Sequence, residues 1–267
     1  MTGAGEQEHH DGGRPADDAT DHEIARLLAL AAGELLIALR DDMTASGTSQ
    51  WALKDAGDIQ SHDYLVAELD RLRPDDAVLS EEGRDDPIRL DAHRVWIVDP
   101  LDGTREYGEG RPDWAVHVAL AIDGEPCVGA VSLPMLGRVL DTGIPAIVPP
   151  RPEGRPLRLA VSRSRPTMVS VTVASALHGE LLAMGSAGFK AMAVVMGEVD
   201  AYVHAGGQYE WDNCAPAAVA LSAGLHASRL DGSRLTYNHA DPYLPDFVIC
   251  RPELADDVLS LVAPFVG

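Results

Sequence analysis

The sequence WIVDPLDGTREY, residues Trp96–Tyr107, constrains the fold more than any other part of the chain. Its apolar start predicts a buried strand. Pro100 fixes its own φ and stops the strand, and Gly103 can take the positive φ of a tight turn. We therefore expect the turn to direct Asp99 and Asp102 toward the same point in space.

Two carboxylates at one point repel each other, so either one stays protonated or a cation holds both. The backbone carbonyl of Leu101 lies between them in the sequence and adds a third oxygen. Hard oxygen ligands of this kind suit Mg²⁺, which also accepts water and a substrate phosphate. Thr104 offers a neighbouring hydroxyl that can orient or deprotonate an attacking water.

Two other interpretations of this pattern stay open. Asp and Gly are common turn residues, so D-x-x-D-G can be a turn and nothing more. A structural calcium loop is the second alternative, although Pro100 and Leu101 do not fit the alternating acidic positions of an EF-hand.

The composition limits the classes of partner. The 267 residues are 46% hydrophobic, enough to bury a core in one large domain or two coupled halves. The 42 acidic residues outnumber the 21 basic ones, which argues against a nucleic-acid polymer because no Lys/Arg stripe exists to release counterions. A small phosphorylated substrate remains compatible if cations lie between it and the protein. The three cysteines form no C-x-x-C pair, so we expect reduced thiols in a cytoplasmic protein.

The chain is expected to divide into a tail and two halves. Residues 1–20 are polar and acidic, which predicts a disordered tail without the apolar region of a signal peptide. No later stretch reaches membrane-spanning length. The proline-rich residues 144–156 break regular structure and mark a seam. We expect residues 21–146 to combine helices with an antiparallel sheet (α+β) and residues 147–267 to alternate strands and helices (α/β).

Periodicity and turn residues predict the individual elements. Apolar residues recur every three to four positions in 23–39, with Asp21 as the N-cap, and again in 58–72. Asp123-Gly124 separates two strands and predicts a hairpin. The remaining expected strands are 95–99, 137–141, 157–162, 200–204 and 246–251, and the remaining helices follow Pro166 or span 186–196, 212–223 and 252–262.

Two further acidic positions favour the metal interpretation. Glu81-Glu82 stands upstream of the strand that ends at Asp99. Asp212 follows Trp211 and opens an alanine-rich helix, whose positive end favours an anion. Each has a simpler explanation by itself, because acidic pairs are usually solvated loops and Asp is a common helix cap.

The order Glu-Glu, Asp-Pro-Leu-Asp-Gly-Thr and Trp-Asp resembles the inositol monophosphatase superfamily of Mg²⁺-dependent, lithium-sensitive phosphatases, from about Glu23 to the end of the chain. This superfamily includes inositol monophosphatases, fructose-bisphosphatases and 3′(2′),5′-bisphosphate nucleotidases of the CysQ type. The resemblance implies a layered αβαβα sandwich of the sugar-phosphatase type, two to three Mg²⁺ ions and inhibition by Li⁺. Such proteins often form homodimers.

Carried over by position, the resemblance implies five metal ligands. Glu81, Asp99 and the Leu101 carbonyl would hold one ion, and Asp99, Asp102 and Asp212 would hold a second.

The resemblance also implies the catalytic residues, which are Asp58, Glu81 and Thr104. Gly103 and Thr104 would meet the phosphate through backbone N–H groups, and Asp58 would complete the activation of water through Thr104. The preceding residues 54–57, Lys-Asp-Ala-Gly, depart from the Thr/Ser-Ala pattern usual in the family before this aspartate.

Several short segments resemble the nucleotidases more than the inositol enzymes. These are Arg105-Glu106-Tyr107, Ser162-Arg163-Ser164 and the segment GSAGFK at 185–190, whose lysine could pair with a second phosphate. Ala205 stands where the inositol enzymes carry a sugar-contacting Glu. The implied substrate contacts beyond Gly103 and Thr104 are Arg105, Ser162, Ser164, Ser186 and Lys190.

The resemblance therefore implies that the chain hydrolyses the 3′-phosphate of 3′-phosphoadenosine 5′-phosphate, giving AMP and phosphate in sulfate assimilation. An inositol-1-phosphate or fructose-1,6-bisphosphate phosphatase of the same superfamily stays open as an alternative. A non-catalytic metal- or nucleotide-binding relative is the alternative from another class.

Overall fold

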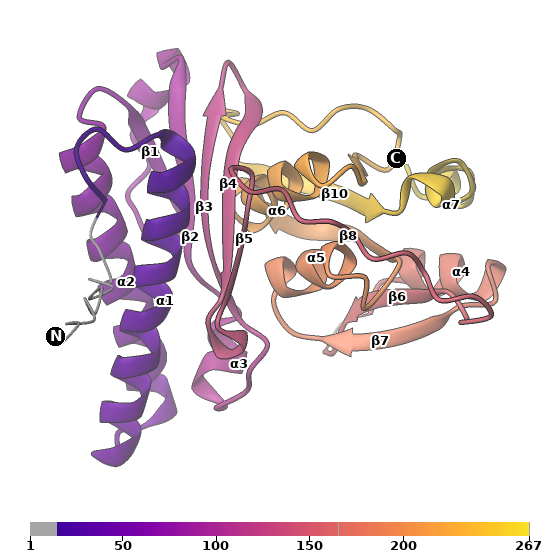
Figure 1. Ribbon diagram of the computed structural model, residues 1–267, viewed down its shortest axis with the longest axis horizontal. Helices are drawn as coiled ribbons and strands as arrows, with labels where there is room; N and C mark the ends of the chain where they lie inside the picture. The colour runs from indigo at the N-terminus through magenta and orange to yellow at the C-terminus, as the bar shows by residue number, and fades with distance from the viewer. Residues whose placement is uncertain (1–14, 165, 267) are drawn as a thin grey trace, which may run out of the picture.

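The structure is a computed structural model and describes residues 15–164 and 166–266. Two five-stranded sheets alternate with layers of helices (Figure 1). The outer layer on the first sheet consists of α1 (Asp21–Ala45) and α2 (Gln50–Leu72). The layer between the sheets consists of α5 (Ala187–Val195) and α6 (Glu210–Ser222). On the far side of the second sheet lie α4 (Met168–Ala176) and α7 (Ala255–Val262), so the predicted αβαβα sandwich is confirmed.

The first sheet carries the turn that the sequence singles out. Its strands run in the order β1 (Ala77–Ser80), β2 (Arg94–Asp102), β3 (Ala115–Ile122), β4 (Glu125–Leu133) and β5 (Arg138–Asp141). The pairs from β2 to β5 are antiparallel, and β3 and β4 form the hairpin predicted around Asp123-Gly124. β1 pairs with β2 in parallel, so the sheet is mixed and the prediction of an antiparallel sheet was wrong in this respect.

The second sheet is also mixed, and three of its strands run parallel to one another. Its order is β7 (Glu180–Met184), β6 (Arg158–Ser162), β8 (Ala201–Tyr209), β10 (Tyr243–Cys250) and β9 (His226–Ser228). β6 runs parallel to both β7 and β8, while β10 runs antiparallel to β8 and β9. The carboxyl ends of β6 and β7 therefore share one edge, where open α/β sheets commonly bind ligands.

Two helix starts differ from the predictions. Thr20, not Asp21, is the N-cap of α1, because its hydroxyl accepts from Glu23 N while the Glu23 carboxylate accepts from Thr20 N at 2.8 Å. Asp21 lies in the first turn instead, where its carboxylate binds Arg73 and Arg94. α2 begins at Gln50, well before the predicted residue 58. The prediction began too late because the first turns of this helix bury little apolar surface and give no periodic signal.

Smaller elements complete the chain. α3 (Thr104–Gly108) follows the turn directly, and a 3₁₀ turn at Pro252–Leu254 precedes α7. Residues 142–157 contain no helix or strand and connect β5 to β6. Most of the predicted tail, residues 1–14, lies outside the described residues. Residues 15–20 pack on α2, where the Arg71 guanidinium donates to the Pro15 carbonyl at 3.1 Å.

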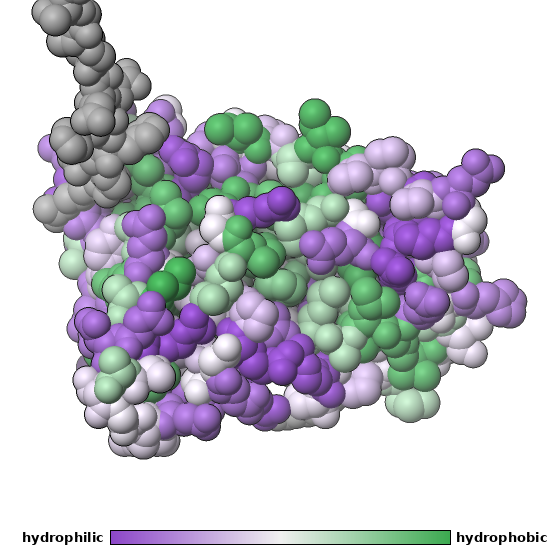
Figure 2. All heavy atoms as spheres, turned by 60° about the horizontal axis from the view of Figure 1, so that its bottom comes forward, coloured by the Kyte–Doolittle hydropathy of each residue, from purple (hydrophilic) through white to green (hydrophobic). Residues whose placement is uncertain are grey.

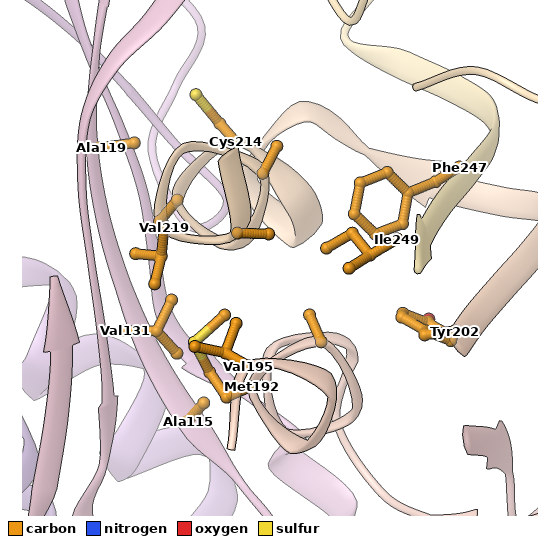
Figure 3. Packing of buried hydrophobic residues seen from close by; sticks show 14 of the residues in the cluster. Ala115, Ala119, Val131, Met192, Val195, Tyr202, Cys214, Val219, Phe247 and Ile249 are labelled. Carbon is orange, nitrogen blue, oxygen red and sulfur yellow. The ribbon is translucent and has the colours of Figure 1, made fainter. Parts of the chain in front are cut away.

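The core between the sheets ties both halves together. Figure 3 shows Ala119 and Val131 of the first sheet facing Val219 of α6 and Val195 of α5. On the far side of the same helices, Tyr202, Phe247 and Ile249 come from the second sheet (Figure 3). Because α5 and α6 belong to the C-terminal half but cover the N-terminal sheet, a side chain from either half can reach the turn after β2.

Hydrophilic side chains cover much of the face shown in Figure 2, with apolar ones scattered among them, as the strong negative charge leads one to expect. Cys127 is exposed, Cys214 and Cys250 are buried, and all are free thiols. Among the described residues, no helix combines the length and the apolar character that crossing a membrane requires.

Candidate metal centre and active site

The turn after β2 brings the two aspartates together inside the protein. Gly103 adopts a φ of 92°, and an added Cβ there would lie 3.1 Å from Ser186 Cβ and 3.2 Å from Trp114 Cβ. Glycine is therefore required by both backbone conformation and space. Asp99 is 1% exposed and Asp102 is 7% exposed. Ligand atoms of these two residues and of His117 all lie within 4.8 Å of one another.

Three further carboxyls from separate elements surround the turn: Asp58 on α2, Glu81 after β1 and Asp212 on α6. Burial, together with neighbouring carboxylates, raises the pKa of Asp58, Glu81 and Asp212 to about 7. The same two causes raise the pKa of Asp99 well above its ordinary value. Glu81 is exposed as a whole residue, but the protein crowds its carboxyl group, which interacts with that of Asp99. A cation bound among these carboxyls would relieve this accumulation of like charge.

Asp102 differs from its neighbours because protein donors surround its carboxylate. Ser186 Oγ donates to Asp102 Oδ2 at 2.5 Å, Gly188 N donates to the same oxygen at 2.6 Å, and Ala187 N donates to Oδ1 at 3.1 Å. Burial alone would raise the pKa of Asp102. His117, the Lys190 charge and the Ser186 hydroxyl instead hold this pKa down, at about 2. Asp102 therefore stays ionised, as a metal ligand must be.

Thr104 connects the turn to α2. Its hydroxyl lies 3.3 Å from Asp58 Oδ1 and 3.2 Å from the Leu101 carbonyl oxygen, so it can donate to one of them at a time. A carboxyl with a pKa near 7 is matched to accept a proton at neutral pH. The geometry brings together the predicted Asp58, Leu101 and Thr104 in one chain of contacts.

Asp212 occupies the first turn of α6. β8 leads directly into the helix, and Asp212 Oδ2 accepts from Tyr209 N at 2.7 Å, which closes the helix start. Among the described residues, this hydrogen bond involves Oδ2 alone, and Oδ1 of the same carboxylate accepts none. The anion is also favoured here by the helix dipole. The sequence predicted a cap or first-turn position, and the structure places the residue in the first turn.

The predicted substrate residues separate into two groups. Ser162 and Ser164 line a cavity of about 520 Å³ together with Thr167, His204 and Gly207. Arg105 is exposed on α3.

Ser186 and Lys190 are instead engaged within the protein. The Ser186 hydroxyl binds Asp102. Lys190 is 5% exposed, donates to the carbonyls of Gly185 and Ser186, and lies 5.3 Å over the Tyr202 ring. The structure does not bring these two side chains to the wall of the cavity.

Three residues near the site were not among the predicted site residues. Arg163 pairs with Glu106 and Asp113, and Asp113 also accepts from Gly185 N at 2.6 Å, so these contacts hold the loops around α5 together. His117, which lies within β3, is the third. The signal available in the sequence was a titratable residue inside the apolar run WAVHVAL. The structure places this residue on the face of β3 that packs against α5 and α6.

A layered αβαβα sandwich with a cluster of carboxylates at one strand-ending turn defines a class of sugar-phosphatase folds. Within that class, the chain belongs to the inositol monophosphatase family, and residues 17–144 and 154–262 match the sequence pattern of that family. A 3′-phosphoadenosine 5′-phosphate phosphatase of Mycobacterium leprae is 49% identical, over 92% of this chain and 94% of that protein. The 3′(2′),5′-bisphosphate nucleotidase CysQ of Escherichia coli K12 is 30% identical, over 71% of this chain and 81% of that one.

Solved structures share the fold. CysQ from Bacteroides thetaiotaomicron superposes with a TM-score of 0.72 at 26% identity, covering 86% of this chain and 97% of that one. Inositol monophosphatase II from Staphylococcus aureus superposes with a TM-score of 0.75 at 20% identity, covering 91% and 95%.

Proposed function

We propose that this protein is a metal-dependent phosphomonoesterase that removes the 3′-phosphate of 3′-phosphoadenosine 5′-phosphate, releasing AMP and phosphate. The observation that carries the proposal is the 49% identity, over nearly the whole length of both chains, to a phosphatase named for that substrate. The buried carboxylates around the turn after β2 supply a matching site.

The donor set fits Mg²⁺, because every side-chain group is a hard oxygen ligand and the carboxyls crowd one another. Glu81, Asp99 and the Leu101 carbonyl would hold one ion, and Asp99, Asp102 and Asp212 a second. When bound, such a pair of ions activates water and stabilises the leaving oxygen. It also lets an acidic protein accept an anionic substrate.

The chain's own groups orient the reaction. The Thr104 hydroxyl lies between the Leu101 carbonyl and Asp58. It would take a proton from the attacking water as it gives its own proton to Asp58 Oδ1, so that the threonine stays neutral, the water becomes hydroxide and Asp58 becomes protonated. Backbone N–H groups of Gly103 and Thr104 would orient the phosphate oxygens. Asp58 thus completes the activation chain, and Glu81 contributes as a ligand.

The cavity beside Ser162 and Ser164 is the proposed place for the nucleoside and its second phosphate, because its volume of about 520 Å³ suits a nucleotide-sized group. Arg105 would contact the substrate from α3. Ser186 and Lys190 would contact it from the start of α5. The proposal includes inhibition by Li⁺, a role in sulfate assimilation in the cytoplasm, and assembly as a homodimer.

Phosphate release in Mg²⁺ from 3′-phosphoadenosine 5′-phosphate, inositol 1-phosphate and fructose 1,6-bisphosphate tests the proposal. We expect the highest kcat/KM for the nucleotide, suppressed by Li⁺ and abolished by a chelator. A higher kcat/KM for either of the other two phosphates would show that this compound is the substrate instead. A protein that binds Mg²⁺ but releases no phosphate would be the non-catalytic relative.

A further inference from the structure

One buried imidazole touches both segments that carry ligands of the proposed second metal site. His117 on β3 is 0% exposed, and its Nδ1 lies 2.9 Å from the Trp211 carbonyl oxygen. Because a carbonyl only accepts, Nδ1 is the hydrogen-bearing nitrogen in this contact. On the other side of the ring, Nε2 lies 3.2 Å from Asp102 Oδ2. Trp211 immediately precedes Asp212, so the ring spans from the end of β2 to the start of α6.

The same ring packs against the backbone of α5. A Cβ added at Gly188 would lie 1.9 Å from His117 Nε2 and 2.8 Å from Cε1, so only glycine fits beside this histidine. Gly188 N in turn donates to Asp102 Oδ2 at 2.6 Å. His117, Gly188 and Asp102 therefore all contact one another beside the proposed metal site.

Within the described residues, His117 Nε2 is buried and makes no aligned hydrogen bond, although the Asp102 carboxylate lies beside it. A buried polar atom of this kind has a structural or functional reason. The Gly188 backbone lies so close to Nε2 that one added carbon would overlap it. The ring is therefore packed tightly between the Asp102 carboxylate and the first turn of α5.

We propose that His117 is a positioning residue for the second metal site. Asp102 and Asp212 come from different halves of the chain, and no covalent neighbour sets the distance between them. The rigid His117 ring binds the Trp211 carbonyl, contacts the Asp102 carboxylate and packs on Gly188. It therefore fixes the positions of β2, α5 and α6 relative to one another. This inference rests on the metal site of the proposed function.

Calorimetric titration with Mg²⁺ tests the inference without depending on turnover. His117→Ala is expected to weaken Mg²⁺ binding by about 10- to 100-fold, the usual cost of losing a partner that orients a ligand. Val118→Ala is the matched control, because Val118 lies next along β3 but belongs to the core against α1 and α2. We expect Val118→Ala to lower the melting temperature and leave Mg²⁺ affinity unchanged.

A double-mutant cycle isolates the contact itself. Gly188→Ala should weaken Mg²⁺ binding strongly in the natural chain, because the new methyl group displaces the His117 ring. In the His117→Ala background the space is open, so the same substitution should cost little. If the alanine variant of His117 does not fold, His117→Asn, which keeps an N–H donor for Trp211 but has no ring against Gly188, replaces it in the same cycle.

The outcomes separate the two proposals. Equal Mg²⁺ affinity in His117→Ala and Val118→Ala, or an equal cost of Gly188→Ala in both backgrounds, would overturn the positioning role while leaving the metal site in place. A natural chain that binds no Mg²⁺ would instead remove the proposed function and this inference together.

Discussion

Ser186 Oγ lies 2.5 Å from Asp102 Oδ2, so the residue that caps α5 in the C-terminal half holds a carboxylate at the end of β2 in the N-terminal half. The backbone N–H groups of Ala187 and Gly188 complete the contact. A helix N-terminus favours an anion, so this arrangement keeps Asp102 charged and oriented before any ligand arrives.

Ser186→Ala removes a hydroxyl that both donates to Asp102 and accepts from Phe189 N. We expect the free energy of unfolding to fall by about 2 kcal/mol, because a buried hydrogen bond to a charged group and a helix cap are lost together. Chemical denaturation measures this loss. A rise in KM with unchanged stability would show that Ser186 contacts the substrate instead, as the sequence predicted.

Asp102→Asn places an amide among donors that need an acceptor. Turnover should fall by a factor of about a hundred or more, because a ligand charge is lost and the remaining oxygen is held by α5. Phosphate release measures the effect, and far-ultraviolet circular dichroism should show a nearly intact fold. Substantial remaining activity would disprove the assignment of Asp102 to the second metal.

Thr104→Val keeps the shape of the side chain but removes the hydroxyl between Asp58 and Leu101. We expect kcat to fall by about 10²- to 10⁴-fold, the typical contribution of a positioned proton-transfer group. Mg²⁺ affinity should not change, and calorimetry provides this control. If Mg²⁺ affinity falls as much as kcat, the hydroxyl supports the metal rather than the water.

Mg²⁺ should stabilise the protein more at high pH than at low pH. The pKa values of Asp58, Glu81 and Asp212 are about 7 in the folded state, above their ordinary values near 4. Folding of the metal-free protein therefore weakens as pH rises from about 4 to about 7, because the unfolded chain loses these protons first.

Since Mg²⁺ binds the ionised carboxylates, its stabilising effect should grow across the same range. Melting temperatures with and without Mg²⁺ at pH 5 and pH 8, at matched ionic strength, measure this difference. An equal rise in melting temperature at both pH values would contradict the prediction.

Lys190→Ala tests whether a buried charge serves the second phosphate. The Lys190 ammonium donates to the Gly185 and Ser186 carbonyls, so the substitution loosens the first turn of α5. If the ammonium leaves those carbonyls to bind the second phosphate, KM for 3′-phosphoadenosine 5′-phosphate will rise more than KM for inositol 1-phosphate, because only the nucleotide carries that group. Equal losses on both substrates would show that Lys190 acts through that backbone alone.

Several parts of the fold gave weak signals in the sequence. β1 and β7 were not predicted, because they are short and neither alternates cleanly between apolar and polar residues. The parallel pairing of β1 with β2 depends on the crossover between them and has no local mark. The first turns of α2 bury little, so periodicity detected only the later part of that helix.

The turn that carries Asp99 and Asp102 could be predicted from local sequence, because Pro100 and Gly103 act on their own backbone dihedrals and need no distant partner. The groups that surround those carboxylates could not be predicted in this way, because they depend on tertiary packing. Ser186, Gly188 and His117 reach Asp102 from α5 and β3 through the packing of two sheets on one helical layer. Such contacts join residues far apart in the chain, and no local pattern specifies which of them will meet.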